Sequence, residues 1–218
     1  MSRPIKTDLK ILVIGSSGTG KTSFVQRWTK GEYSGNYKPT VVSEFGFKIF
    51  EYNNRTYRIQ LWDIGGQDKS PSMAKIFARD SHGCVVLSDV TKKETLQNTL
   101  DWKKVVSDES KFVDGEKLPF ILIQNKIDLI NDKNELEEIE NETKNISENN
   151  EFAKYYMASV KENINIDESM QFLIANIIER LENYASVGNE VFEDQKQRET
   201  LQLDRNSSVR SKKKENCC

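Results

Sequence analysis

A glycine-rich segment near the amino terminus restricts the possible folds and ligands of this chain more than any other segment. Residues 15–22 read Gly-Ser-Ser-Gly-Thr-Gly-Lys-Thr, directly after the apolar run 11–14 and before a helix-like stretch. This is a G-x-x-x-x-G-K-[ST] phosphate-loop pattern in its strand-to-helix setting. The glycines let backbone N–H groups point inward, and the next helix adds its positive end, which favours a polyphosphate ligand. A simple glycine-rich turn is the alternative, because the pattern arises by chance in roughly 1% of chains this long.

The last two residues of the loop predict how a nucleotide would be held. Lys21 would reach the β- and γ-phosphates, and the Thr22 hydroxyl would ligate a Mg²⁺ ion that bridges them. Downstream, Asp63-x-x-Gly66-Gln67 stands at the end of an alternating strand-like run. Asp63 would hold Mg²⁺ through water, the Gly66 N–H would contact the γ-phosphate, and Gln67 would orient an attacking water.

A third motif predicts which base is bound. Asn125-Lys126-Ile127-Asp128 follows the apolar run 120–124. The Asp128 carboxylate can accept hydrogen bonds from both N1–H and N2–H of guanine, a pair of donors that adenine lacks. The three motifs in this order have a chance frequency below about 10⁻⁵. Together they predict a guanine-nucleotide site.

The hydrophobic pattern predicts an α/β fold. Apolar runs at 84–87 and 120–123 are typical of strands covered on both faces, and residues 45–61 alternate around an Asn53-Asn54 turn, as in a hairpin. We expect a mostly parallel sheet with one antiparallel edge strand, a capping box at 91–94, and a final helix over about 167–185. Between residues 131 and 151, eight acids face two lysines, which predicts a solvated acidic insertion with some helix.

Composition limits the remaining possibilities. The 218 residues suit one domain with an appendage, and a net charge of −2 gives no reason to expect nucleic acid as a partner. No signal peptide or run of 18 apolar residues is present, so we expect synthesis and residence in the cytosol. The three cysteines, at 84, 217 and 218, predict neither a disulfide framework nor a zinc cluster.

With these motifs in place, residues 8–185 resemble the Ras-like small GTPases, and the Rab branch in particular. The resemblance implies a P-loop NTPase small G domain with six strands, a mostly parallel sheet, one antiparallel edge strand and helices on both faces. It implies that Thr40 closes on Mg²⁺ and the γ-phosphate, that Tyr33 packs against guanine, and that 159–161 is similar to the family's Ser-Ala-Lys guanine loop. The predicted metal ligands are Thr22, Thr40 and Asp63, and the predicted catalytic residue is Gln67. The predicted nucleotide contacts are Ser17, Gly18, Thr19, Gly20, Lys21, Thr22, Ser23, Tyr33, Thr40, Gly66, Asn125, Lys126, Asp128, Ser159, Val160 and Lys161.

Some positions depart from the usual Rab pattern. Residues 41–45 read Val-Val-Ser-Glu-Phe and lack the glycine that usually follows the switch threonine, which leaves effector specificity open. Gly65 replaces Ala and Asp68 replaces Glu, and the added backbone freedom predicts slow hydrolysis. Ile64 and the segment 111–119 resemble the Rab branch linked to lysosome-related organelles and mitochondria.

Residues 186–218 are expected to form a flexible hypervariable tail. The tail carries five bases and one acid between 205 and 216, and it ends in Cys217-Cys218. In a Rab-like protein this ending resembles a double prenylation site. The resemblance implies a protein that is anchored on the cytoplasmic face of an intracellular membrane and cycles through the cytosol. The implied partners are effectors, an exchange factor, a GTPase-activating protein, a GDP-dissociation inhibitor and a prenylation escort.

Two other functions compete with a membrane-tethered GTP/GDP switch in vesicle traffic. One is a nucleotide-bound scaffold that barely hydrolyses GTP and works only by binding partners. The other is a P-loop kinase or ATPase, which Asp128 disfavours because its carboxylate selects guanine.

Overall fold

Six strands form one sheet in the order β2-β3-β1-β4-β5-β6. This computed structural model describes residues 7–35, 44–65 and 72–186. All neighbouring strands are parallel except β2, which runs antiparallel to β3 at one edge. The predicted α/β class with a single antiparallel edge strand is therefore confirmed. The strands are β1 (Thr7–Gly15), β2 (Glu44–Tyr52), β3 (Arg55–Asp63), β4 (Gly83–Asp89), β5 (Phe120–Asn125) and β6 (Lys154–Ala158).

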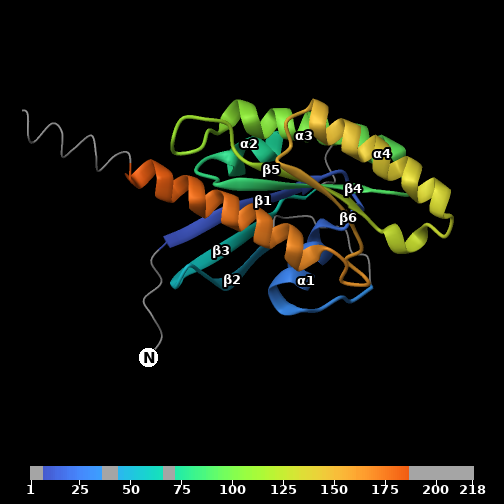
Figure 1. Cartoon of the computed structure of the whole chain (residues 1–218), viewed down its shortest axis with the longest axis horizontal. Coiled ribbons are helices and arrows are strands. Elements are labelled where there is room, and N and C mark those ends of the chain that lie inside the picture. Colours follow the sequence, from blue (N-terminus) through green and yellow to red (C-terminus); the bar gives the residue numbers. More distant parts are fainter. Residues whose placement is uncertain (1–6, 36–43, 66–71, 187–218) are drawn as a thin grey trace, which may run out of the picture. The chain divides into compact units, whose positions relative to one another are not determined.

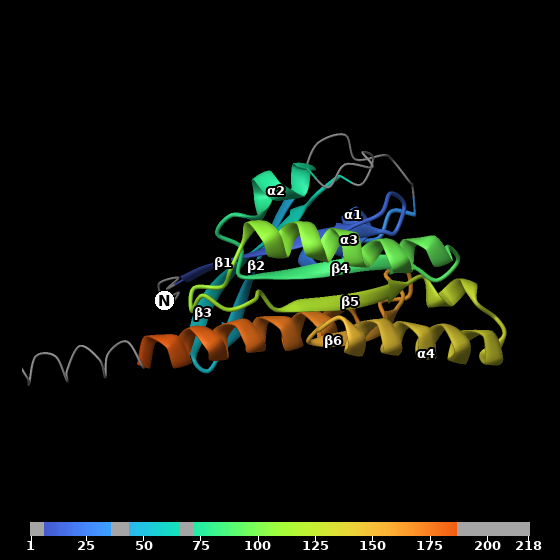
Figure 2. The same cartoon turned by 90° about the horizontal axis from the view of Figure 1, so that it is seen from above.

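Helices cover both faces of this sheet, as Figures 1 and 2 show. Helices α2 (Ser72–Ala78), α3 (Lys93–Glu109) and α4 (Lys133–Asn149) lie over one face, and α1 (Lys21–Lys30) lies over the other. Every residue of β4 and β5 is consequently buried, as expected for central parallel strands that helices cover on both sides. A short 3₁₀ helix, η1 (Ile127–Leu129), follows β5.

Helix α1 follows the phosphate loop as the sequence predicts. Its apolar residues Phe24, Val25 and Trp28 are buried, because their spacing puts them on one side of the helix. The helix ends at Lys30, and its C-cap Gly31 has a φ of +75°, the left-handed conformation that glycine adopts most easily. This end places the carbonyl of Gly31 next to the loop that leads to Tyr33.

The β2–β3 hairpin turns at Asn53 and Asn54, whose φ angles of 48° and 60° suit a two-residue hairpin turn. The alternation in β2 predicts a strand without saying which of its faces is covered. The small residue Gly46 faces α1, where an added Cβ would lie 2.8 Å from Val25 Cγ1. The larger residues Phe45, Phe47 and Ile49 are exposed. Part of the apolar surface of β2 is therefore accessible from outside the domain.

One local prediction is wrong. The capping box at 91–94 does not form, because α3 starts later, with Lys92 as an N-cap that makes no side-chain hydrogen bond, and the Thr91 hydroxyl donates to Asp89 instead. The acidic segment 131–151 contains the continuous 17-residue helix α4, which packs against β6 and keeps most of its residues exposed, so the predicted helix and solvation are confirmed. Its N-cap Asp132 accepts a hydrogen bond from the Asn134 N–H, and Thr143 and Ser147 are buried.

The last described helix spans residues 166–186, close to the expected 167–185. Residues up to Ile177 belong to one compact unit. Residues 178–186 belong to a second unit and are helical. Before that point Leu173 and Ile177 are fully buried, and their Cδ1 atoms lie near Gly83 at the start of β4. Among the described helices, none combines the length and the apolar character needed to cross a membrane.

Candidate nucleotide site

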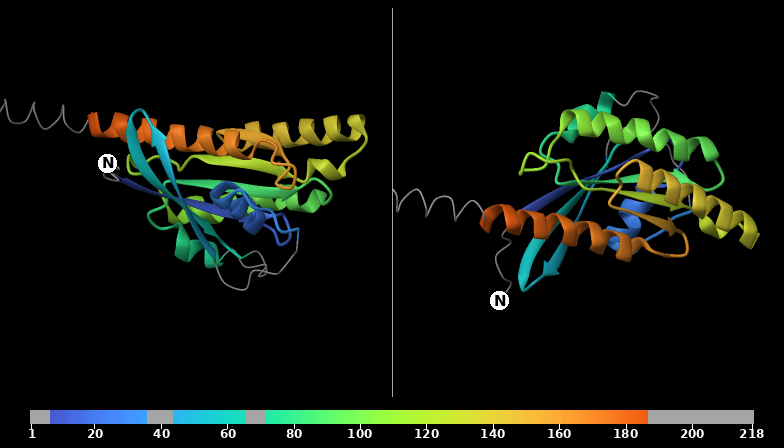
Figure 3. Two further views of the ribbon diagram at one scale, coloured as in Figure 1. Left: turned by 90° about the horizontal axis from the view of Figure 1, so that it is seen from below. Right: turned by 45° about the horizontal axis from the view of Figure 1, so that its top comes forward.

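The predicted motifs meet at one edge of the sheet, because each follows the carboxyl end of a strand. The phosphate loop follows β1, Asp63 ends β3, Asn125 ends β5, and Ser159 follows β6. These strands are neighbours or near neighbours and all run parallel, so their carboxyl ends lie at the same edge (Figure 3). Ligands of open α/β sheets bind at this edge.

Two glycines of the phosphate loop are required by close contacts as well as by their backbone angles. Gly15 has φ +138°, and an added Cβ would lie 2.2 Å from the carbonyl oxygen of Leu87. Gly20 has φ +100°, and an added Cβ would lie 2.5 Å from Asn125 Nδ2. The loop is therefore packed against β4 on one side and against the third motif on the other. Gly18 also has a positive φ, of +78°, but has open space around it.

Lys21 is buried beneath the loop. Its Nζ donates hydrogen bonds of 2.9 Å to the carbonyl oxygens of Gly15 and Ser16. Burial lowers the pKa of Lys21 to about 8, against the opposing effect of the negative charge of Asp63. The Lys21 ammonium therefore lies at the phosphate loop, where the negative oxygens of bound phosphates would stabilise its charge.

Thr22 and Asp63 form the described part of the predicted metal site. The Thr22 hydroxyl donates to Asp63 Oδ2 over 2.5 Å, although the two residues are 41 positions apart in the chain. A hydroxyl and a carboxylate are hard oxygen ligands of the kind that Mg²⁺ takes, so this pair fits the ion. Thr40, the third predicted ligand, lies outside the described residues, as do Gly66 and Gln67.

Asn125 joins the phosphate loop to the predicted guanine loop, residues 159–161. Its Nδ2 donates to the Thr19 carbonyl at 2.8 Å, and its Oδ1 accepts from the Val160 N–H at 3.1 Å. The resemblance assigns a backbone N–H of this loop to guanine, whereas the Val160 N–H donates here to Asn125.

Asp128 is held by two residues of the guanine loop. The Ser159 hydroxyl donates to Asp128 Oδ1 at 2.5 Å, and Lys161 Nζ lies 3.6 Å from Oδ2. These contacts fix the plane of a carboxylate that is only 10% exposed. The arrangement suits a carboxylate that must present two acceptors to one base edge.

Lys126 has a partner that the sequence motifs do not indicate. Its Nζ lies 2.6 Å from Asp89 Oδ2, and Asp89 Oδ1 accepts from the N–H and hydroxyl of Thr91. Burial acts to raise the pKa of Asp89, but the hydrogen bonds from Lys126 and Thr91 outweigh it, so the pKa lies below its usual value. Asp89 thus stays ionised and orients Lys126.

The other predicted contacts are placed as follows. Ser17 and Ser23 lie on the phosphate loop and the first turn of α1, and Tyr33 is 40% exposed, with its ring centroid 5.7 Å from the Arg27 guanidinium carbon. Arg27 has no motif to signal it in the sequence. The predicted lipidation sites Cys217 and Cys218 lie outside the described residues.

A second group without a sequence motif is aromatic. Trp62 at the end of β3 lies between Phe45 of β2 and Phe77 of α2, with ring centroids 5.4 and 5.7 Å away. Phe45 is 53% exposed, and Phe47 and Ile49 continue the exposed apolar surface along β2. We call Phe45, Phe47, Ile49, Trp62 and Phe77 the apolar strip. In the chain it lies next to the segments that contain Thr40 and Gln67, which we call the first and second switch segments, since β2 starts at Glu44 and β3 ends at Asp63.

Comparisons with known proteins agree with this geometry. The sequence pattern of the Ras family matches residues 10–179. Human Ras-related protein Rab-7L1 is 36% identical over 170 residues, which cover 78% of this chain and 82% of that protein. Human Ras-related protein Rab-32 is 30% identical over 210 residues, covering 96% of this chain and 88% of that protein. Rab-32A of Dictyostelium discoideum is 33% identical over 171 residues, covering 78% and 77%. The chain therefore belongs to the Ras family, as a Rab-type small GTPase of the branch that holds Rab-7L1 and Rab-32, and it binds guanine nucleotides and hydrolyses GTP.

Proposed function

We propose that this GTPase is a membrane-tethered switch in vesicle traffic, which hydrolyses GTP slowly with Mg²⁺. The observation that best supports the proposal is the meeting of three motifs at one sheet edge. Thr22 contacts Asp63, and Asn125 contacts both the phosphate loop and the guanine loop. One ligand that carries both phosphates and guanine would account for all of these positions.

In the proposed reaction the loop binds the phosphates and Lys21 supplies a fixed positive charge beside them. Thr22, Thr40 and Asp63 would hold Mg²⁺, which neutralises charge on the β- and γ-phosphates when bound. Gln67 would orient the attacking water, and the Gly66 N–H would contact the γ-phosphate. Gly65 adds backbone freedom next to these two residues, so we expect alignment of the water to limit the rate.

The apolar strip is the proposed surface for effectors. It is exposed along β2, it joins β2, β3 and α2, and it lies beside the segments that contain Thr40 and Gln67 in the chain. Exposed aromatic surface of this kind is typical of protein-binding sites. The γ-phosphate would order both switch segments, and effectors would then bind them together with the strip. An exchange factor and a GTPase-activating protein would act on the same segments.

The membrane part of the proposal depends on the tail. Cys217 and Cys218 would carry two prenyl groups, which anchor stably where a single chain binds only marginally. The five bases of residues 205–216 would add attraction to the anionic cytoplasmic leaflet, at about 1 kcal/mol each. A prenylation escort and a GDP-dissociation inhibitor would be needed to deliver and retrieve such a protein through the cytosol.

Single-turnover GTP hydrolysis by the purified protein tests the catalytic part of the proposal. We expect a rate on the order of 10⁻⁴ s⁻¹ with Mg²⁺, similar to Ras-type domains without an activating protein. Gln67→Leu should abolish turnover while leaving nucleotide binding intact, and ATP should not compete with GTP. Equal turnover by wild type and Gln67→Leu would contradict the assigned role of Gln67. If both proteins bind GTP but neither hydrolyses it, the scaffold function is favoured. Hydrolysis after addition of an activating protein would then exclude the scaffold function.

A further inference from the structure

The guanidinium of Arg27 connects three segments that are separate in the sequence. From helix α1, its Nε donates to the Val160 carbonyl at 3.0 Å and an Nη atom donates to the Lys161 carbonyl at 2.9 Å. Its other Nη atom donates to the Gly31 carbonyl at 2.9 Å, and the guanidinium lies 5.7 Å from the centroid of the Tyr33 ring. One side chain therefore contacts the guanine loop, the end of α1 and the start of the first predicted switch segment.

These contacts hold backbone groups of the guanine loop that Asn125 does not bind. The Val160 N–H donates to Asn125, and the Val160 carbonyl accepts from Arg27, so this residue is held at both of its backbone polar groups. Asn125 in turn donates to Thr19 of the phosphate loop. A continuous set of hydrogen bonds thus runs from the phosphate loop through Asn125 and Val160 to Arg27.

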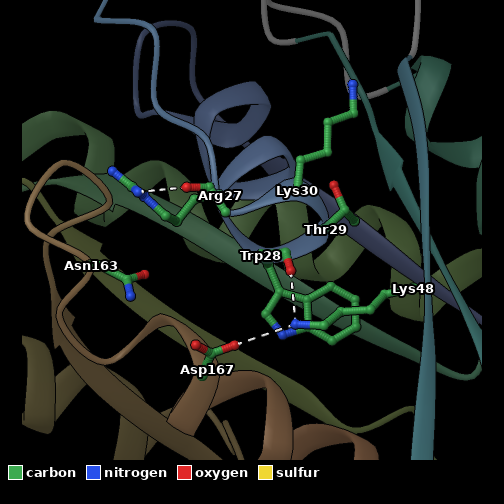
Figure 4. A pocket seen from close by; sticks show the side chains of 8 residues that line it. Arg27, Trp28, Thr29, Lys30, Lys48, Asn163 and Asp167 are labelled. Atoms are coloured by element: carbon green, nitrogen blue, oxygen red, sulfur yellow. Dashed lines mark hydrogen bonds and ion pairs between the residues drawn. The ribbon is translucent and has the colours of Figure 1, made fainter.

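Arg27 also differs from Lys48, another cation that lines the same pocket. Figure 4 shows a pocket of about 240 Å³ whose wall includes Arg27, Lys48 and Asp167. Lys48 donates to the Trp28 carbonyl and pairs with Asp167, which ties α1 to β2 and to the start of the last helix. The Arg27 side chain leaves α1 on the side of the loop that bears Asn163. Lys48 is therefore occupied in joining structural elements, whereas Arg27 is directed at the guanine loop.

We propose that Arg27 is a positioning residue for guanine recognition, which holds residues 159–161 in place and couples them to Tyr33. The inference rests on the proposed assignment of this loop and Asp128 to the base. Ser159 and Lys161 orient Asp128, so a shift of the loop changes the carboxylate that contacts guanine. If Tyr33 moves away from Arg27, Arg27 would hold residues 159–161 less firmly. A change in the first switch segment would in this way affect binding of the base.

The test compares release of fluorescent GDP and IDP from wild type, Arg27→Lys and Arg58→Lys. Inosine lacks the exocyclic amino group, so the ratio of the two release rates reports the contact with Asp128. Lysine keeps the charge, but its three donors lie on a single nitrogen and cannot reproduce the planar fork whose three nitrogens reach the three carbonyls. We expect Arg27→Lys to release GDP about tenfold faster, because it loses hydrogen bonds that hold the guanine loop, and to release IDP only slightly faster. Arg58 of β3, which pairs with Asp8 of β1, is the matched control, and Arg58→Lys should match wild type.

The coupling to Tyr33 is tested by a double-mutant cycle. Tyr33→Leu removes the ring beside Arg27, and Tyr33→Phe keeps it. We expect Tyr33→Leu to speed GDP release severalfold in the wild-type background and little further in Arg27→Lys, while Tyr33→Phe has a small effect in both. Additive effects of the two substitutions would overturn the coupling.

The outcomes separate this inference from the proposed function. A wild-type protein that binds GDP and IDP equally would contradict the assignment of Asp128 and its loop to guanine. Guanine-selective wild type with an unchanged GDP-to-IDP ratio in Arg27→Lys would overturn the positioning role alone. If Arg27 had a purely structural role, Arg27→Lys would release GDP and IDP faster by the same factor. It would also have a lower melting temperature at saturating nucleotide.

Discussion

At the scale of single residues, Gly20 is the point where two motifs constrain one another. Its φ of +100° disfavours any side chain, and an added Cβ would lie only 2.5 Å from Asn125 Nδ2. Gly31 has a similar positive φ, of +75°, but an added Cβ there would have no atom within 4 Å. The two glycines therefore separate the cost of the backbone angle from the cost of the clash.

We expect Gly31→Ala to lower the free energy of unfolding by about 1 kcal/mol, the cost of a left-handed alanine. Gly20→Ala should cost about 2–3 kcal/mol, because Asn125 must also leave its bond to Thr19. Urea denaturation of both variants measures the difference. Equal losses would mean that Asn125 yields to the added methyl group without cost.

Lys21 links nucleotide binding to pH. Burial lowers its pKa to about 8, and phosphates would favour the charged form and raise that pKa. Binding would then take up a proton above pH 8, so we expect affinity to be constant below pH 8 and to fall by up to tenfold per pH unit above it. Titrations with fluorescent GDP between pH 7 and 9.5 measure the slope, and Lys21→Met should bind weakly without this slope.

The same pKa shift predicts the stability of the nucleotide-free protein. The unfolded chain keeps Lys21 protonated up to its ordinary pKa of 10.5, whereas the folded chain releases the proton near pH 8. The unfolded state thus binds more protons between these values, so the contribution of Lys21 to folding stability rises with pH in this window.

At the scale of elements, strand β2 presents a small residue to helix α1 and large residues outward. A Cβ at Gly46 would lie 2.8 Å from Val25 and 3.2 Å from Thr29. We expect Gly46→Val to cost about 1–3 kcal/mol of folding stability, because α1 and β2 cannot separate without disturbing the core. Thermal unfolding checks this value.

The outward face of the same strand serves as the control. Phe47 is 57% exposed, so Phe47→Ser should change stability by less than about 1 kcal/mol. It should instead weaken binding of effectors to the GTP-bound protein, which pull-down with a GTP-loaded sample measures. A Phe47→Ser protein that is as destabilised as Gly46→Val would show that the face assignment of β2 is wrong.

The elements themselves were largely predictable. Helix α1 follows the phosphate loop, and β4 and β5 are buried throughout, as the sequence predicts. For helix α4 the sequence predicts only some helix within a solvated acidic segment, because the residues that α4 buries are small and polar, Thr143 and Ser147. The short helix α2 has seven residues, too few for a helical period to stand out.

At the scale of the whole molecule, we propose that the tail sets where the switch acts. With both cysteines prenylated, we expect the protein to float with anionic vesicles. Cys218→Ser should bind weakly and in a salt-sensitive manner, since one chain is marginal and the bases of the tail are screened by salt. The double variant Cys217→Ser/Cys218→Ser should remain in solution. If the double variant floated with the vesicles, the proposed membrane tether would be wrong.

The sequence by itself determined the kind of fold and the chemical parts of the site. Short motifs with defined spacing mark the phosphate loop, Asp63 and Asp128, and local periodicity marks helices and strands, because both depend on neighbours within a few residues. Parallel strands bring their carboxyl ends to one edge, so the meeting of these motifs also follows from the α/β pattern.

Only the tertiary structure decided which other residues join them. Arg27 contacts Val160 across 133 positions of the chain, and Lys126 contacts Asp89 across 37. Neither pair has a local pattern, because long-range packing rather than spacing brings the side chains together. The exposed face of β2 also depends on tertiary structure. Alternation predicts that the strand has two different faces, but only the position of α1 shows that the face with Gly46 is covered and the face with Phe45 and Phe47 is exposed.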